Sequence, residues 1–195
     1  PQATTVALNW DKTGLRVTFD CADKGIFAVQ QWRDNIKLWK DDSIYLWLDP
    51  GHTHNAEHDL LMIQVSAAGE IHDIRHGDLK YDIAGLEAKV QRTADAWSAA
   101  ILIPWAGLGQ QAPKPGEVWG VNLARMDQPG KLDFETMEPS SWLTGPGMDP
   151  QELDRWGHLI FASDAASLAI AQQTINQDHA ARQAQINQHN LPVAQ

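Results

Sequence analysis

Nine tryptophans among 195 residues supply this chain with many large, flat apolar side chains. An indole ring can pack in a protein core, or it can stack against the C–H face of a sugar ring. Trp39 stands before Lys40-Asp41-Asp42, and Trp142 stands before the turn residues Thr144-Gly145-Pro146-Gly147. Because both lie beside loop signals, Trp39 and Trp142 are the candidates for a stacking surface.

A second possible chemistry is metal binding by histidines. His52, His54 and His58 lie with Glu57 and Asp59 in one short loop. Imidazoles and carboxylates at such spacing can converge on zinc or copper. A solvated loop, sensitive to pH through its histidines, is the alternative.

Glycoside hydrolysis would require two carboxylates about 5–10 Å apart across one sugar. The carboxylates of suitable type are Asp41, Asp42, Asp73, Asp127 and Glu135. Spacing singles out none of them, and the sequence has neither a Gly-x-Ser-x-Gly nucleophile motif nor a glycine-rich phosphate loop. We therefore expect a binding protein and not an enzyme.

Composition excludes several classes of partner. The net charge is −10, and the 15 Lys and Arg residues are scattered, which argues against nucleic acid because phosphate binding needs clustered cations. No apolar run approaches the ~20 residues that span a bilayer, so no membrane insertion is expected. The lone Cys21 ends an apolar run and is expected to be a core residue.

Short alternating runs separated by Gly, Pro, Asp and Asn predict the elements that must position these residues. The expected strands are Thr4–Trp10, Gly14–Cys21, Ser43–Asp49, Asp59–Ala67, Glu70–Arg75, Leu86–Thr93, Trp97–Ile103, Val118–Met126 and Trp156–Phe161. Trp47, Trp97 and Trp119 lie inside these runs, so structural roles are expected for them. Short links around Gly14, Gly69 and Ala94 favour hairpins. The pattern predicts an all-β, two-sheet antiparallel sandwich, jelly-roll-like, over residues 1–162.

Residues 163–195 differ in composition from the rest of the chain. They are rich in Ala, Gln and Asn, lack aromatic residues, and read as a helical or flexible tail that Ser163 or Asp164 can cap. Leu168, Ala171 and Ile175 form one narrow apolar stripe. The tail is expected to be largely solvated, with contact to another chain as the alternative.

Three stretches, taken in order, carry a family resemblance. They are Asp41–Pro50 (DDSIYLWLDP), Trp97–Trp105 (WSAAILIPW) and Pro115–Arg125 (PGEVWGVNLAR), and the match closes with Arg155–Phe161 (RWGHLIF). From about Thr4 to Phe161 the chain resembles the family 9 carbohydrate-binding modules and the sandwich domains like them. The resemblance implies a non-catalytic β-sandwich that binds a polysaccharide or oligosaccharide between two tryptophans. It also implies one module of a larger secreted protein, extracellular or periplasmic, with a covalently linked upstream domain.

Carried onto this chain, the family pattern matches Trp39 and Trp142 to the two stacking positions. Tyr45 stands where the family has an acidic residue in the Asp-Asp-Ser strand. Because of this departure, the resemblance does not imply that this chain shares the family's preference for a particular sugar end. Arg75 matches the hairpin arginine, and Asp42, Asn122 and Arg125 complete the carbohydrate-binding candidates. No cofactor is required, but structural calcium is possible in this family, and Asp20, Asp23 and Asp49 are carboxylates of the right type for it.

Two other functions stay open at this point. One is an interaction or assembly scaffold, in which the tail contacts another chain. The other is a haem-binding sandwich of the related electron-transfer type, with Met62, Met126 and His72 as possible axial ligands. Core packing is the competing explanation for Met62, which lies in an apolar strand.

Overall fold

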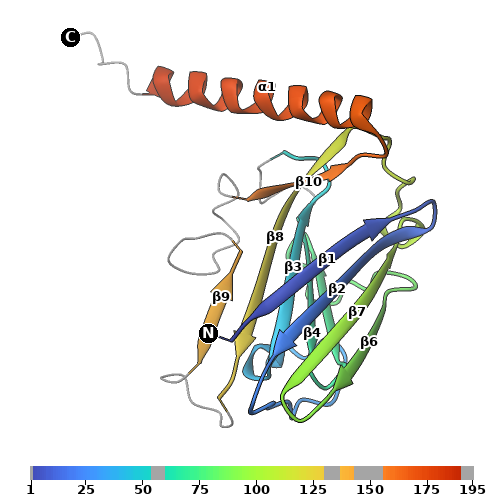
Figure 1. The fold of residues 1–195 in the computed structure, drawn as a ribbon, viewed down its shortest axis with the longest axis vertical. Helices are drawn as coiled ribbons and strands as arrows, with labels where there is room; N and C mark the ends of the chain where they lie inside the picture. Colours follow the sequence, from blue (N-terminus) through green and yellow to red (C-terminus); the bar gives the residue numbers. More distant parts are fainter. Residues whose placement is uncertain (1, 54–59, 130–136, 143–155, 190–195) are drawn as a thin grey trace. The chain divides into compact units, whose positions relative to one another are not determined.

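Ten strands and a C-terminal helix form the part of the chain that the computed structural model describes, residues 2–53, 60–129, 137–142 and 156–189 (Figure 1). Two antiparallel sheets make a β-sandwich, as predicted. The four-stranded sheet has the order β1 (Thr4–Trp10), β2 (Gly14–Ala22), β7 (Ala96–Pro104), β6 (Glu87–Arg92). The six-stranded sheet has the order β10 (Gly157–Phe161), β8 (Glu117–Asp127), β3 (Ser43–Asp49), β4 (Leu61–Ser66), β5 (Ile71–Arg75), and β9 (Glu138–Ser141) also pairs with β8.

Nine of the ten strands lie where the alternating runs predict them. The three expected hairpins are present, since β1 pairs with β2, β4 with β5 and β6 with β7. Strand β9 is not predicted, because Glu138-Pro139-Ser140-Ser141 has no apolar alternation. By compactness the chain divides into two units, Pro1–Ala112 with Gly120–Gly157 and Pro113–Trp119 with His158–Gln195. The expected boundary at residue 162 stays a prediction.

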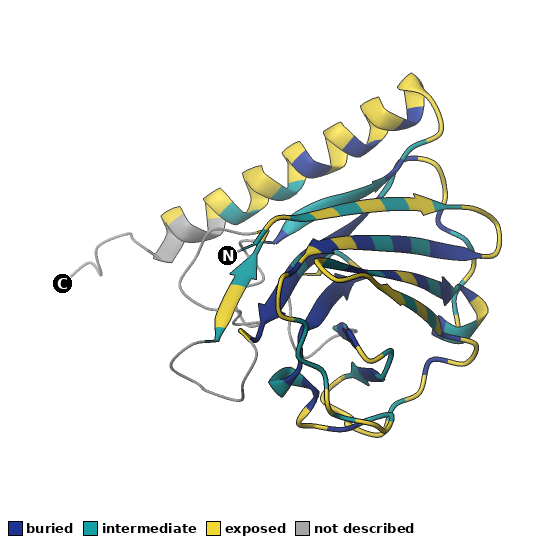
Figure 2. Ribbon diagram, turned by 60° about the horizontal axis from the view of Figure 1, so that its bottom comes forward, coloured by how far each residue is buried: buried dark blue, intermediate teal, exposed yellow. Residues whose placement is uncertain are grey.

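The core lies between the sheets and is built by strand alternation. Val17 and Phe19 on β2, and Ile44 and Leu46 on β3, are almost completely buried. Figure 2 shows the resulting stripes of buried and exposed residues along the strands. Burial of this apolar area is the main favourable term in folding, at about 25 cal/mol per Å².

Strand β3 is buried on both of its faces. Tyr45 and Trp47 alternate with the core residues and therefore point to the outer face of the six-stranded sheet, yet they are only 6% and 4% exposed. They belong to an apolar group on this face, which we call the outer aromatic cluster. It consists of Tyr45, Trp47, Ala124, Met126 and Trp156, with Trp39, Leu60, Met62 and Met137 packed against it.

The tryptophans assigned to structural roles are buried. Trp47, Trp97 and Trp119 are each 4% exposed or less. Trp105 is also buried, and its indole N–H donates a hydrogen bond to the Asp11 carbonyl at 2.7 Å. It precedes the 3-10 helix η2 (Ala106–Leu108), which Gly109 ends in the left-handed conformation at φ 68°.

The tail forms helix α1 (Ala165–His189), capped by Asp164, whose carboxylate accepts the Ser167 N–H at 2.8 Å. Ala171 and Ile175 are buried with Val118 and Ile160, whereas Leu168 is half exposed. No helix among the described residues is long and apolar enough to cross a membrane. Contact of the tail with another chain stays a prediction.

Candidate functional site

The outer face of the six-stranded sheet brings together several of the predicted binding residues. Strand pairing sets Tyr45 of β3 opposite Gln64 of β4 and opposite Ala124 of β8. Ala124 in turn lies opposite Ser141 of β9. Residues that are directly opposite one another share a sheet face, so this row leads from Tyr45 across the sheet to the residue before Trp142.

Tyr45 occupies the position where the family pattern expects an acid. Its ring stacks on that of Trp47, with centroids 5.1 Å apart and planes 10° from parallel. Its hydroxyl accepts a hydrogen bond from the Gln64 amide at 2.7 Å, and the same amide donates to Ser43 at 3.1 Å. Burial raises the pKa of the Tyr45 hydroxyl, so this position offers a neutral donor and not a carboxylate.

Asn122 lies opposite Trp47 and therefore on the same outer face. Its side-chain oxygen accepts hydrogen bonds from the Ser141 hydroxyl at 3.1 Å and from the Leu123 N–H at 2.8 Å. These two bonds fix the orientation of the amide. The Asn122 amide nitrogen is thereby left as a positioned donor beside β9.

Trp142 follows β9 directly and is 56% exposed. Its backbone N–H donates to the Leu123 carbonyl at 2.8 Å, which extends the pairing of β9 with β8 by one residue. The six-membered part of its ring lies against Gly157, where a Cβ atom would overlap it. The exposed ring is therefore held by a backbone hydrogen bond and by contact with a glycine.

Trp39 lies in the 3-10 helix η1 (Leu38–Lys40) and is half buried against the outer aromatic cluster. Its carbonyl accepts a bond from the Gln128 amide at 3.3 Å, and the Lys40 ammonium stands 5.3 Å from the centre of its ring. Trp39, Tyr45 and Asn122 are thus the predicted residues that this face of the sheet gathers, whereas Trp142, opposite Leu123 and one residue beyond Ser141, is directed by alternation to the other side of the sheet edge.

Arg75 points elsewhere. It lies opposite Leu61 of β4, whose side chain belongs to the core, so alternation directs Arg75 away from the face that carries Tyr45. Its guanidinium donates to the Leu108 carbonyl at 3.1 Å and to the Tyr81 hydroxyl at 3.2 Å. Its role in sugar binding stays a prediction.

Asp42 belongs to a different group of residues. Its carboxylate oxygens accept the N–H groups of Phe27 and Gln128, and the neighbouring Asp41 accepts those of Val29 and Gln30. The Asp-Asp pair before β3 therefore ties down the loop that leads into this strand. Both carboxylates are completely buried.

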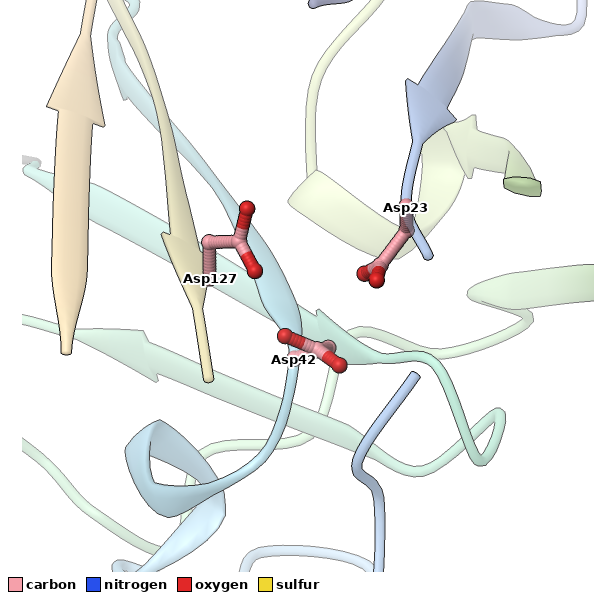
Figure 3. A group of neighbouring side chains, drawn as sticks. All are labelled: Asp23, Asp42 and Asp127. Carbon is pink, nitrogen blue, oxygen red and sulfur yellow. The ribbon is translucent and has the colours of Figure 1, made fainter. Parts of the chain in front are cut away.

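Figure 3 shows Asp42 converging with two further carboxylates, Asp23 from the end of β2 and Asp127 from the end of β8. One oxygen from each of the three lies within 4.8 Å of the others, and all three residues are buried. Burial, together with the charges of its two neighbours, raises the pKa of Asp42 from its ordinary value of 3.8 to about 7. Burial also raises the pKa of Asp127.

Arg125 is the cation of this acidic group. It is 2% exposed, and its guanidinium lies 2.9 Å from Asp23 and 3.3 Å from Asp127. It also donates to the Ala22 carbonyl at 2.8 Å, because its place opposite the core residue Ile44 directs it between the sheets. Its predicted contact with sugar is untested.

The acidic group fits a divalent metal by charge and by donor type. Three carboxylates with one guanidinium leave two negative charges when all are ionised, and oxygen donors suit Ca²⁺ or Mg²⁺. A proton on Asp42 is the other way to reduce this charge. Of the carboxylates predicted to bind calcium, only Asp23 joins the group, and Asp42 and Asp127 were missed because their convergence depends on strand pairing.

The remaining predicted metal ligands lie separately. Asp20 is exposed on β2, and Asp49 is buried and accepts a hydrogen bond from Thr53. The His52 N–H donates to the Asp49 carbonyl at 3.0 Å in the turn after β3. His54 and His58 lie outside the described residues, so the histidine site stays a prediction.

A shallow groove of about 420 Å³ lies on the outer face of the four-stranded sheet. Thr5, Asp20, Ser98 and Gln91 stand opposite one another across its four strands and line it. The groove has no exposed aromatic side chain, in contrast to the edge of the six-stranded sheet that carries Trp142. It is the alternative location for a polar ligand.

Comparison with solved structures finds proteins with a similar arrangement of strands. A family 9 carbohydrate-binding module from Caldicellulosiruptor kristjanssonii in complex with glucose aligns with a TM-score of 0.63 at 15% identity, over 83% of this chain and 78% of that chain. The fold resembles that of family 9 carbohydrate-binding modules. The same organism's module with cellotriose gives 0.61 at 14% identity, over 85% of this chain and 78% of that one.

A candidate carbohydrate-binding protein from Bacteroides uniformis has a TM-score of 0.63 at 12% identity, over 82% of this chain and 78% of that chain. At these identities the likeness concerns the fold. No family model matches the chain, and no curated protein matches it.

Proposed function

We propose that this chain is a non-catalytic carbohydrate-binding module, which holds a sugar at the β9 edge of its six-stranded sheet. The observation that carries the proposal is the exposed, positioned ring of Trp142 at the β9 edge of this sheet, directly after Ser141, which lies on the same face as Tyr45 and Asn122. The likeness to modules solved with glucose and cellotriose supports the same ligand class. As in that family, the module would belong to a larger secreted protein.

In this proposal Trp142 supplies the principal stacking surface. A sugar ring presents C–H groups on its faces and hydroxyl groups at its edge, so it needs an aromatic plane and donors beside it. Asn122 and Ser141 lie next to Trp142 and supply an amide and a hydroxyl. Trp39, on the outer aromatic cluster, supplies the second ring.

A divalent cation, which we take to be calcium, has a structural role in this proposal. Asp23, Asp42 and Asp127 would hold it, and it would offset the charge that these buried carboxylates share. The group joins the ends of β2 and β8 and the start of β3, so ion binding would tighten one end of the sandwich. Sugar recognition does not involve it.

Affinity electrophoresis of the full chain tests the proposed function. Gels would contain hydroxyethyl cellulose, mixed-linkage β-glucan, xylan or mannan, with bovine serum albumin as the non-binding reference. We expect at least one polysaccharide to retard the chain, and its soluble oligosaccharide to reverse the retardation. Equal mobility in all four gels would contradict the proposal.

The groove on the four-stranded sheet provides the control for location. Ser98→Trp places a large side chain among Asp20, Gln91 and Thr5 without touching the other sheet. We expect this variant to be retarded like the parent and Trp142→Ala to migrate freely. The opposite result would place the sugar in the groove.

A further inference from the structure

The histidines of β10 and α1 form a pair that neither the sugar site nor the acidic group uses. The Nε2 atoms of His158 and His179 lie 3.4 Å apart, and the ring centroids are 5.4 Å apart. The two nitrogens lie closer together than the ring centres, so they are on the facing edges of the two rings. Both residues belong to the same compact unit.

Backbone periodicity places these residues together independently of how their rings turn. Ile160 follows His158 by two positions on β10, so both point to the same face of the strand. His179 follows Ile175 by four positions on α1, so both lie on the same face of the helix. Ile160 and Ile175 already pack together with Val118 and Ala171. The histidine pair continues this contact by one helical turn.

The separation of the nitrogens is that of two ligands on one metal ion. Two imidazole nitrogens bonded to a tetrahedral zinc ion at about 2.0–2.1 Å stand about 3.3–3.4 Å apart. Imidazole nitrogen is a preferred donor for Zn²⁺, Cu²⁺ and Ni²⁺, and a poor one for calcium. Asp178, the residue before His179, is paired with Arg182 at 2.7 Å, and we expect water to complete the coordination.

We propose that His158 and His179 bind a divalent transition metal, zinc by geometry, which fastens helix α1 to β10. The helix buries Ala171 and Ile175 as its apolar contacts in this unit, so one metal crosslink adds substantially to a small interface. Binding of metal to the folded helix but not to the detached one stabilises the docked state by mass action.

Calorimetric titration of ZnCl₂ into the tag-free full chain tests this site. Excess calcium is kept in the buffer so that the carboxylates of Asp23, Asp42 and Asp127 are not counted. We expect one zinc ion to bind per chain, and His158→Gln and His179→Gln each to weaken binding at least tenfold. Glutamine keeps the size and polarity of histidine but is not a zinc ligand.

The matched control is the variant His52→Ala/His54→Ala/His58→Ala, which removes the other histidine group and should bind zinc like the parent. Hydrogen exchange gives a second readout, because zinc should slow amide exchange in residues 165–184 of the parent but not of His179→Gln. Three results would each overturn the proposal. They are loss of zinc binding in the triple variant alone, zinc binding as strong as the parent's in both glutamine variants, and no saturable binding by the parent.

Discussion

Trp142 lies with the six-membered part of its ring directly on Gly157, so closely that no side chain fits at that position. The glycine serves as the support on which the exposed indole rests. Gly157 begins β10, and the backbone of Trp142 is bonded to Leu123 of β8. The orientation of the proposed stacking ring therefore depends on a residue that has no side chain.

Gly157→Ala is predicted to displace the Trp142 ring and weaken sugar binding about tenfold, or ~1.4 kcal/mol. The added Cβ would overlap the ring, which must then swing out of place. Calorimetry with the oligosaccharide selected by electrophoresis measures the effect. Gly25→Ala is the matched control, because nothing lies within 4 Å of a Cβ there. Parental affinity in Gly157→Ala would show that the ring does not need this support.

Arg125→Met is predicted to destabilise the fold by about 3–5 kcal/mol, because it leaves the buried carboxylates of Asp23 and Asp127 without their cation. Urea unfolding measures the loss. Arg16→Met is the control, since its ion pair with Asp11 is exposed and should contribute under ~1 kcal/mol. Equal losses in both variants would contradict a structural role. A fall in sugar affinity of folded Arg125→Met would instead place Arg125 in the sugar site.

In EDTA, the acidic group is predicted to make the free energy of unfolding fall as the pH rises. The folded state raises the pKa of Asp42 to about 7, whereas the unfolded chain keeps it near 3.8, so the folded state binds more protons between these values. Stability should therefore fall as the pH rises from about 4 to 7. Thermal unfolding across this range measures it.

Calcium should reverse this loss above pH 7, where the carboxylates are free to bind it, and should have little effect near pH 5. Asp42→Asn should flatten the pH dependence only in part, because burial also raises the pKa of Asp73, to about 6. An unchanged slope in Asp42→Asn would contradict the assignment of this titration to Asp42.

Alternation in the sequence is enough to predict the sandwich. The runs Thr4–Trp10 and Ser43–Asp49 were predicted with the bounds that the structure has. Their β-branched and aromatic residues signal strands, and the short glycine-containing links signal hairpins. The alternation pattern does not predict strand β9, because its pairing with β8 comes from tertiary contact and not from its own composition.

The site is only partly predictable, because it depends on strand register. Loop signals identify Trp142, but its support by Gly157 joins two segments that the sequence separates. Asp42 and Arg125 have the chemistry of sugar ligands, yet register turns Arg125 inward opposite Ile44. A one-residue shift in register would reverse these faces, and sequence periodicity alone does not set it.

The most direct test of the central claim is the sugar affinity of Trp142→Ala measured beside that of Trp32→Ala. Both tryptophans are exposed, at 56% and 61%, so the two variants remove comparable surface. Stacking contributes about 1 kcal/mol or more beyond buried area, so calorimetry should show at least a fivefold loss for Trp142→Ala and parental affinity for Trp32→Ala. Parental binding by Trp142→Ala, or an equal loss in both variants, would contradict a sugar site at Trp142.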